Sequence, residues 1–428
     1  MKRLISIDYL RGIAILGVVF YHATIFNSPP PGEGPTFPDI LWVNVILLII
    51  TYFSAWAGMF GIISGTSNTI SLYGRFRSGK IKNPKQILYY ALFQGSMILL
   101  INYIYLFVFC PGWVVDNRMV GGFLPILIRT GQIFASNQNY LFATALMMIG
   151  WSILLSGVLL YFLLRNNGYL KRKRNYSVLI ALATFCVFIY PLIQQPALAF
   201  MSEALTITNF VPRLFLSWLV GQMDPILPYF GFALYGVISG LMLVDEEPKQ
   251  KILKYGYGIG IIYTVIGLIS TLIFGIEFPD FAVPPLPTIL MLLGPMFLLY
   301  TWMLHNMDFK DEKQKIKWVN RSKTIRRVAI VSLTVFLLEG SMAQLLRHVM
   351  LLLYPGFDVD YLFMFFIFGT INLIVWSLIL IVWEKFDFKY SFEWVLIKLA
   401  RKITHKESVR LRASKRLDSY VDMEKSSE

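Results

Sequence analysis

The sequence predicts an all-α protein: a polytopic membrane helix bundle of about ten transmembrane helices, with both termini in the cytoplasm. Composition is the first reason. Of 428 residues, 56% are hydrophobic and 15% are charged, and the mean hydropathy is +0.61, a balance typical of integral membrane proteins. The second reason is the order of the residues, because long apolar runs alternate with connections whose charge follows the positive-inside rule.

Basic connections identify the cytoplasmic side of the bundle. The connection at 75–85 carries five basic residues, and those at 165–175 and 308–327 are also rich in Lys and Arg. The connection at 275–285 lies between two spans on the opposite side and contains neither Lys nor Arg. The spans that satisfy this alternation are residues 4–27, 40–66, 86–110, 140–164, 177–200, 226–244, 254–275, 287–307, 328–352 and 361–383.

Some segments are expected to depart from simple spanning helices. Residues 123–134 (FLPILIRTGQIF) are amphipathic, so we expect them to lie in the outer interface or to dip back into the protein. Pro191, Gln194 and Pro196 lie near the outer end of the fifth span and suggest a broken or kinked helix beside a cavity. We expect residues 1–390 to form the bundle and residues 391–428 to form a basic, amphipathic cytoplasmic tail.

The composition also argues against several classes of protein. The formal net charge of +14 does not indicate nucleic-acid binding, because the basic residues lie in loops between apolar runs. Cys110 and Cys186 lie in apolar segments without metal-ligand spacing, so we expect no metal cofactor and no disulfide framework. A cleavable signal peptide is not expected either, since Asp8 and Arg11 interrupt the first apolar run.

Ionisable residues in the first span are the strongest indication of function. A charge at the centre of a spanning helix costs roughly 2.5–3.5 kcal/mol, so such residues usually face a protein interior or a water-filled cavity. Asp8, Arg11 and His22 share one face, because the eleven steps from Arg11 to His22 come to nearly three whole turns. At a rise of about 1.5 Å per residue, Arg11 and His22 lie about 16 Å apart along the axis. We therefore expect this helix to form one wall of a path across the membrane.

Each candidate residue also has a structural interpretation. Arg11 lies about two turns inside the membrane and can snorkel to the cytoplasm, while His22 fits an interfacial histidine. Asp224 is a candidate substrate ligand, but it also fits a cap at the start of the sixth span, with Pro225 in the first turn. Glu339 lies inside the ninth span and has two interpretations. It is a structural partner for a buried donor, Arg11 or another group, or it contacts the substrate.

A short internal repeat relates the second and sixth spans. Residues 60–65 (FGIISG) and 235–240 (YGVISG) place glycine and serine at the predicted cytoplasmic ends of both spans. Small residues there usually permit close helix packing. The alternative is that glycine-rich helix ends leave backbone donors free beside a ligand. In that case the candidate cofactor-binding residues are Ser64, Gly65, Ser239 and Gly240, together with Arg11.

Three stretches resemble a known group of proteins. Residues 3–17 (RLISIDYLRGIAILG) have the form R-x-x-x-I-D-Y-L-R-G-I-A-I-L-G, and residues 223–231 (MDPILPYFG) resemble a D-x-x-P-x-x-P-W-F/L-G segment. Residues 383–394 (WEKFDFKYSFEW) resemble a C-terminal W-x-x-F…P-L-E-W ending. These stretches resemble those of the transmembrane acyltransferases related to heparan-alpha-glucosaminide N-acetyltransferase and the bacterial inner-membrane proteins grouped with them. Because the three stretches lie near both ends and in the middle of the sequence, the resemblance covers most of the chain.

The spacing of two residues in the first span resembles a second group. Arg11 and His22 fit the R-x10-H pattern of the acyltransferase-3 family, whereas the heparan enzyme has asparagine at the position of His22 and a functional histidine in the following loop. The loop at 28–40 contains no histidine here. This difference places the expected base at His22 and favours the broader transmembrane acyltransferase superfamily.

The resemblance implies transfer of an acyl group, usually acetyl, from cytoplasmic acyl-CoA to an acceptor on the outer side. His22 is then the base for the attacking hydroxyl or amine, acting directly or through an acyl-imidazole. Arg11 is expected to bind the phosphate or carbonyl region of CoA, and Asp8 to orient Arg11. The expected substrate-binding residues are Asp8, Asp224 and Glu339.

The expected partners follow from that activity. They are the lipid bilayer of the cell membrane, acyl-CoA and a glycan, lipid or other glycoconjugate acceptor, with a homodimer as a candidate assembly and no nucleic acid. The alternative function is a transporter or flippase for a polar small molecule or lipid-linked substrate. Intramembrane charges and a broken fifth helix also mark substrate pathways, which keeps this alternative open.

Overall fold

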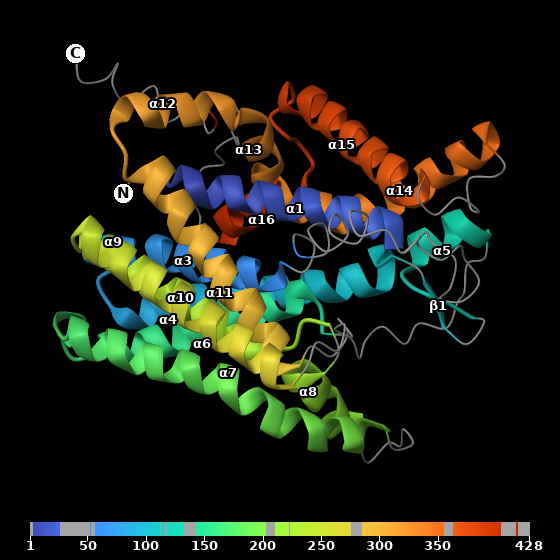
Figure 1. Cartoon of the computed structure of the whole chain (residues 1–428). Coiled ribbons are helices and arrows are strands. Elements are labelled where there is room, and N and C mark those ends of the chain that lie inside the picture. Colours follow the sequence, from blue (N-terminus) through green and yellow to red (C-terminus); the bar gives the residue numbers. More distant parts are fainter. Residues whose placement is uncertain are drawn as a thin grey trace. The chain divides into compact units, whose positions relative to one another are not determined.

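The computed structural model describes residues 3–25, 52, 56–111, 113–115, 118–131, 143–202, 210–221, 223–274, 285–354, 363–403 and 417. Helices dominate these residues, so the predicted all-α membrane bundle is confirmed (Figure 1). Nine of the described helices are long and apolar enough to cross a membrane. The chain divides into two compact units.

The first unit consists mainly of Trp56–Tyr103 and Tyr140–His305. Its central helix is α9 (Ile226–Val244), which is buried along almost its whole length. This helix is hydrophobic all round, as expected of a span surrounded by other helices. The helices in contact with it include α3 (Ala57–Arg77), α6 (Ala145–Leu164), α7 (Arg172–Ser202) and α8 (Phe210–Val220).

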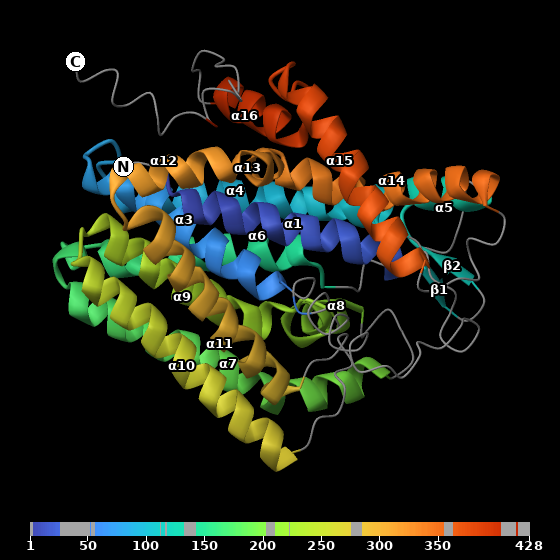
Figure 2. The ribbon, with the colours of Figure 1, turned by 45° about the horizontal axis from the view of Figure 1, so that its top comes forward.

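The remaining helices complete the first unit. The helices α10 (Lys249–Phe274) and α11 (Leu286–Met303) pack side by side, as Figures 1 and 2 show. The helix α4 (Pro84–Ile104) follows α3, and a short turn of helix, η3 (Gly168–Leu170), separates α6 from α7.

Glycines allow α3 and α9 to approach closely. A Cβ atom at Gly65 would lie 2.1 Å from the carbonyl oxygen of Ala233, and one at Gly236 would lie 2.2 Å from that of Ile62. Gly240 packs in the same way against Thr66 and Thr69 of α3. The two repeated segments therefore face each other, and the interpretation of their small residues as a close helix contact is confirmed.

The second unit consists of Leu4–Ala55, Ile104–Asn139 and Asn306–Glu428. The helix α1 (Ile5–Ile25) packs against three others: α13 (Lys323–Ile330), α14 (Ser332–Leu353) and α15 (Gly369–Glu384). Two further helices are amphipathic, α12 (Glu312–Arg321) before α13 and α16 (Phe392–Ile403) after α15. The π-helical segments are η1 (Tyr105–Phe109), η4 (Leu304–Asp308), which begins in the first unit, and η5 (Phe363–Phe368).

A small segment of the second unit follows η1. Strands β1 (Trp113–Val115) and β2 (Arg118–Val120) form an antiparallel pair, and the helix α5 (Phe123–Thr130) comes next. The helix places apolar side chains along one face, as expected for the amphipathic segment 123–134. Residues 132–134 of that segment lie outside the described residues.

Several predicted boundaries are wrong. The second span was expected to end at 66, but α3 continues to Arg77, so part of the predicted basic loop is helical. Most of residues 40–55 lie outside the described residues. The ninth span is divided at Val331, where the backbone leaves helical geometry between α13 and α14. The expected loops at 201–224 and 308–327 contain α8 and α12.

The fifth span, which was expected to be broken or kinked, is not broken. The helix α7 runs without interruption from Arg172 to Ser202 and contains both Pro191 and Pro196. Each proline removes one backbone donor but leaves its neighbours in helical geometry. Gln194, between the two prolines, is buried and donates a hydrogen bond to the hydroxyl of Tyr190 one turn earlier. The polar group therefore has a partner on its own helix.

Candidate functional site

A histidine and a buried glutamate meet in the second unit. Nδ1 of His22, on α1, lies 2.6 Å from Oε1 of Glu339 on α14. The side chain of Glu339 is 1% exposed, while that of His22 is 20% exposed. The short distance is typical of a charge-assisted hydrogen bond. Glu339 therefore has a structural partner, the half-buried His22, and its predicted contact with substrate stays a prediction.

Apolar and aromatic groups enclose this pair. The ring of Phe336 lies 6.5 Å from that of His22, and the ring of Tyr105 lies 5.1 Å from that of Phe336. Pro111 packs directly on α14 at Gly340, where a Cβ atom would lie 2.6 Å from Cγ of the proline. Gly340 therefore lets the chain after η1 cover the helix beside the glutamate. Such surroundings keep water from the carboxylate and strengthen its interaction with the histidine.

The geometry defines which nitrogen of His22 can act as a base. Because Nδ1 contacts a carboxylate oxygen, the proton is assigned to Nδ1 when the glutamate is ionised. The lone pair of the neutral imidazole then lies on Nε2, the ring nitrogen that can act as a base toward a substrate. The second carboxylate oxygen, Oε2 of Glu339, is buried and has no hydrogen-bond partner among the described residues. The carboxylate is thus directed at the histidine by a single strong contact.

The other end of α1 carries the second predicted group. Nη1 of Arg11 lies 4.0 Å from Oδ1 of Asp8, one turn earlier on the same helix. Asp8 is buried, whereas the side chain of Arg11 is 27% exposed. The carboxylate of Asp308 accepts hydrogen bonds from the backbone N–H groups of Ile5 and Ser6, at 2.8 and 3.0 Å, and so caps the start of α1. The structure brings Asp8 and Arg11 together, as their spacing predicts.

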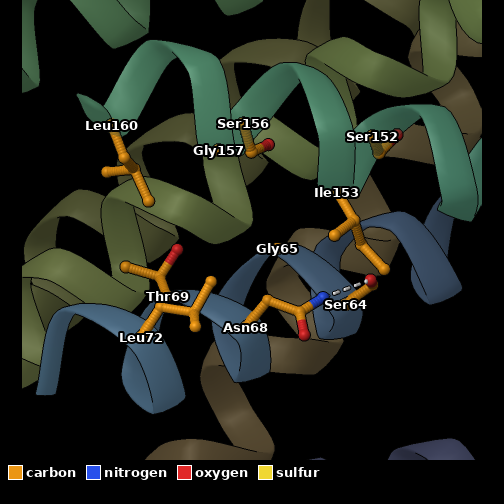
Figure 3. Close-up of a pocket in the computed structure, with 10 residues that line it drawn as sticks. All are labelled: Ser64, Gly65, Asn68, Thr69, Leu72, Ser152, Ile153, Ser156, Gly157 and Leu160. Atoms are coloured by element: carbon orange, nitrogen blue, oxygen red, sulfur yellow. Dashed lines mark hydrogen bonds between the residues drawn. The ribbon is translucent and has the colours of Figure 1, made fainter. Parts of the chain in front are cut away.

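The predicted cofactor residues Ser64 and Gly65 lie within α3, not at its end. Oγ of Ser64 accepts a hydrogen bond of 3.0 Å from Nδ2 of Asn68, and both side chains line a narrow slot between α3 and α6 (Figure 3). Ser152 and Ser156 line the facing side of this slot. Since more than two turns of α3 follow Ser64, the backbone there continues as a helix and leaves no free donors.

The corresponding residues of α9 and Asp224 have other surroundings. Oγ of Ser239 donates to the carbonyl of Tyr235, 3.1 Å away, and Gly240 packs on α3. Pro225, not Asp224, is the N-cap residue of α9. The backbone N–H of Asp224 instead donates to the carbonyl of Ala143, which lies just before α6. All of these residues belong to the first unit, whereas Asp8, Arg11, His22 and Glu339 belong to the second.

Sequence reasoning missed the residue that caps α14. The carboxylate of Glu393, on α16, accepts hydrogen bonds from the backbone N–H of Leu333 at 2.6 Å and from the hydroxyl of Thr334 at 2.6 Å. In return, that hydroxyl accepts the backbone N–H of Phe392 at 2.8 Å. Burial of the carboxylate raises the pKa of Glu393, against the hydrogen bonds that lower it. The available signal was the E-W pair at 393–394 in the C-terminal ending.

A second buried group, Arg326 of α13, was also missed. Its guanidinium donates to the carbonyl oxygens of Leu417 and Val319, at 3.0 and 2.6 Å, and to the hydroxyl of Ser322. The side chain of Leu417 is buried as well, although it belongs to the predicted tail. One point of the tail therefore packs on the bundle. The basic, amphipathic pattern of the tail gave no sign of this contact.

Comparison with known proteins identifies the family of the chain. No curated protein matches the chain. The family model described as an acyltransferase domain, acyltransferase 3, matches residues 4–383, which includes both α1 and α14. That match spans most of the chain and both compact units. The chain therefore belongs to the acyltransferase-3 family of membrane acyltransferases.

Proposed function

We propose that this protein transfers an acyl group, with acetyl as the first candidate, from cytoplasmic acyl-CoA to an extracytoplasmic acceptor. The acceptor class is a glycan, lipid or other glycoconjugate that offers a hydroxyl or amine. The observation that supports the proposal most is the 2.6 Å contact between His22 and Glu339. A general base held by a buried carboxylate is the arrangement that acyl transfer from a thioester requires.

The reaction can be written with the groups of this pair. Nε2 of His22 accepts the proton of the acceptor as its oxygen or nitrogen attacks the carbonyl carbon of the thioester. The carboxylate of Glu339 stabilises the imidazolium that forms and keeps the ring in place. When the C–S bond breaks, the imidazolium returns the proton to the departing thiolate. The products are free CoA and the acylated acceptor.

Arg11 and Asp8 have a role in binding under this proposal. Arg11, with Asp8 beside it, is assigned to the phosphate or carbonyl region of CoA, because a planar guanidinium offers several donors in fixed geometry. The predicted residues of the first unit receive no role here, and their contacts with the donor or the acceptor stay predictions: Ser64, Gly65, Ser239, Gly240 and Asp224. Both termini are placed in the cytoplasm, with the His22 end of α1 toward the outer side.

Transfer across a sealed membrane tests the proposal. Proteoliposomes loaded with labelled acetyl-CoA are supplied outside with a lipid and glycan extract from the source cell. We expect label to appear in the external acceptor with the unchanged protein and to disappear with His22→Ala. The matched control is His348→Ala, on α14, where Nδ1 contacts only a carbonyl of its own helix among the contacts described, that of Gln344 at 3.1 Å. Equal transfer by His22→Ala would refute the assignment of the base.

The transporter alternative has less support than before. One of its two reasons was a broken fifth helix, and α7 is continuous. The other reason was the presence of charged groups inside the membrane. Those groups pair with each other, His22 with Glu339 and Arg11 with Asp8, so they do not require a transported substrate as a partner. In the same proteoliposomes, release of unreacted substrate without acylation of an acceptor would favour transport.

A further inference from the structure

An open pocket lies in the first unit, apart from the residues discussed above. It is formed by the last turn of α3, the start of α4 and the turn that follows α6, and its volume is about 570 Å³. Pockets of about 300–1,000 Å³ commonly hold small molecules. The two basic connections at 75–85 and 165–175 meet here, so the positive-inside rule places the pocket on the cytoplasmic side.

The walls of the pocket are positively charged. Arg77 and Lys82 line it, and none of the described lining residues is acidic. Pro84 also lines it, which puts the N-terminus of α4, a helix of 21 residues, at its edge. The partial positive charge of a helix N-terminus adds to that of the two cations. An anion is therefore the ligand that this pocket fits.

A buried carboxylate pairs with Arg77. Its Nε lies 3.6 Å from Oδ1 of Asp245, a buried residue at the end of α9. The same carboxylate accepts hydrogen bonds from the hydroxyls of Tyr73 at 2.8 Å and Tyr176 at 2.9 Å. Because this contact uses Nε, the terminal amino groups of Arg77 remain available to a ligand. A cation fixed in this way loses little conformational entropy when an anion binds.

An aromatic wall faces the arginine. The ring of Tyr169 lies edge-on to that of Phe76 at 5.7 Å, and the guanidinium of Arg77 lies 5.9 Å from the centre of the Tyr169 ring. The turn that carries Tyr169 is tightly packed, since a Cβ atom at Gly168 would lie 2.0 Å from the carbonyl oxygen of Leu163. The wall is therefore built into the fold and offers a flat surface next to the cations.

From these contacts we infer that the pocket of Arg77, Lys82 and Tyr169 is a binding site for a phosphate-bearing molecule. Two sources supply that chemistry at the cytoplasmic face of a membrane: a soluble nucleotide such as the adenosine end of CoA, and the headgroup of an anionic phospholipid. Arg77 and Lys82 contact the phosphate in either case, and the ring of Tyr169 covers the group attached to it. The inference does not depend on the proposed transfer reaction.

Binding measurements on the full-length protein test this inference. Calorimetry in detergent is carried out with CoA, adenosine 3′,5′-bisphosphate and inorganic phosphate, and native mass spectrometry with phosphatidylglycerol against phosphatidylcholine. We expect at least one phosphate probe to bind and Lys82→Ala to weaken it about tenfold. Tyr169→Ala should weaken the nucleotide more than inorganic phosphate, while Tyr169→Phe should retain binding. Preference for the nucleotides identifies a soluble ligand, and preference for phosphatidylglycerol identifies a lipid.

One matched control variant keeps the test decisive. Lys254→Ala removes an exposed cation of the same unit that does not line the pocket, and it should bind every probe as the unchanged protein does. Arg77→Ala also removes the contact with Asp245 and can lower the stability of the protein. The inference is therefore judged from the binding measurements on Lys82→Ala and Tyr169→Ala. The inference is overturned if no phosphate probe binds at millimolar concentration, or if Lys82→Ala and Lys254→Ala bind equally well. If the unchanged protein binds a phosphate probe but transfers no acyl group in proteoliposomes, only the proposed function is contradicted.

Discussion

Replacing Glu339 with glutamine tests how the histidine is activated. The substitution keeps the size of the side chain but removes the charge that faces Nδ1 of His22 at 2.6 Å. A hydrogen bond to a charged group is worth about 1.5–3 kcal/mol, and in the proposed reaction the imidazolium that needs it forms only as the acceptor attacks. At 1.4 kcal/mol per factor of ten, the loss in kcat is about 10-fold to 150-fold. The loss is larger if the amide donates to Nδ1, because the proton then moves to Nε2 and the base is blocked.

The assay is acetyl transfer in proteoliposomes, with kcat and KM for acetyl-CoA measured separately. We expect Glu339→Gln to lower kcat and to leave KM and the melting temperature nearly unchanged. Ser341→Ala is the matched control, because Ser341 is a buried residue of the same helix whose hydroxyl has no partner among the described residues. An unchanged kcat in Glu339→Gln, or an equal loss in Ser341→Ala, would show that the carboxylate does not act on the histidine.

Three further predictions concern packing, pH and donor binding. Gly236→Ala places a Cβ atom 2.2 Å from the carbonyl oxygen of Ile62, so we expect a cost of about 1–3 kcal/mol as a lower melting temperature, whereas Gly258→Ala, with open space around it, should be neutral. Burial raises the pKa of Glu393, so the folded protein binds this proton more tightly than the unfolded chain does. The stabilisation from this protonation is complete below the unfolded pKa of about 4.3 and is lost as pH rises through the folded pKa. Glu393→Gln should remove the decline in melting temperature that begins above about pH 4.3, and an identical pH profile would contradict this prediction. Arg11→Ala should raise KM for acetyl-CoA more than it lowers kcat, and a change confined to acceptor affinity would contradict the placement of CoA.

The spans were predictable where the helix is apolar all round. The predicted sixth span, 226–244, coincides with α9, because a helix surrounded by other helices must be apolar on every side. The second span was misplaced for the opposite reason. Its helix α3 carries Thr66 and Thr69, which are buried against protein, and Thr66 donates to the carbonyl oxygens of Ile62 and Gly236. Hydropathy alone cannot distinguish such satisfied polar groups from a loop.

The candidate site was predictable only in part. The periodicity of one helix placed Asp8, Arg11 and His22 on a common face, and the contact of Asp8 with Arg11 follows from their spacing. The partner of His22 did not follow, because Glu339 is 317 residues away and its position depends on how α14 packs against α1. A buried charge signals that a partner exists but does not name it.

The position of α14 along its axis decides whether Glu339 reaches the histidine. One residue of slippage moves a helix by about 1.5 Å, enough to break a contact of 2.6 Å. Two contacts oppose such slippage: Glu393 binds the first N–H groups of the helix, and Pro111 packs into the space at Gly340. Neither residue touches His22 in any contact described here, yet both act on the carboxylate through the helix. The C-terminal helix α16 therefore belongs to the support of the site, although it follows the last predicted span.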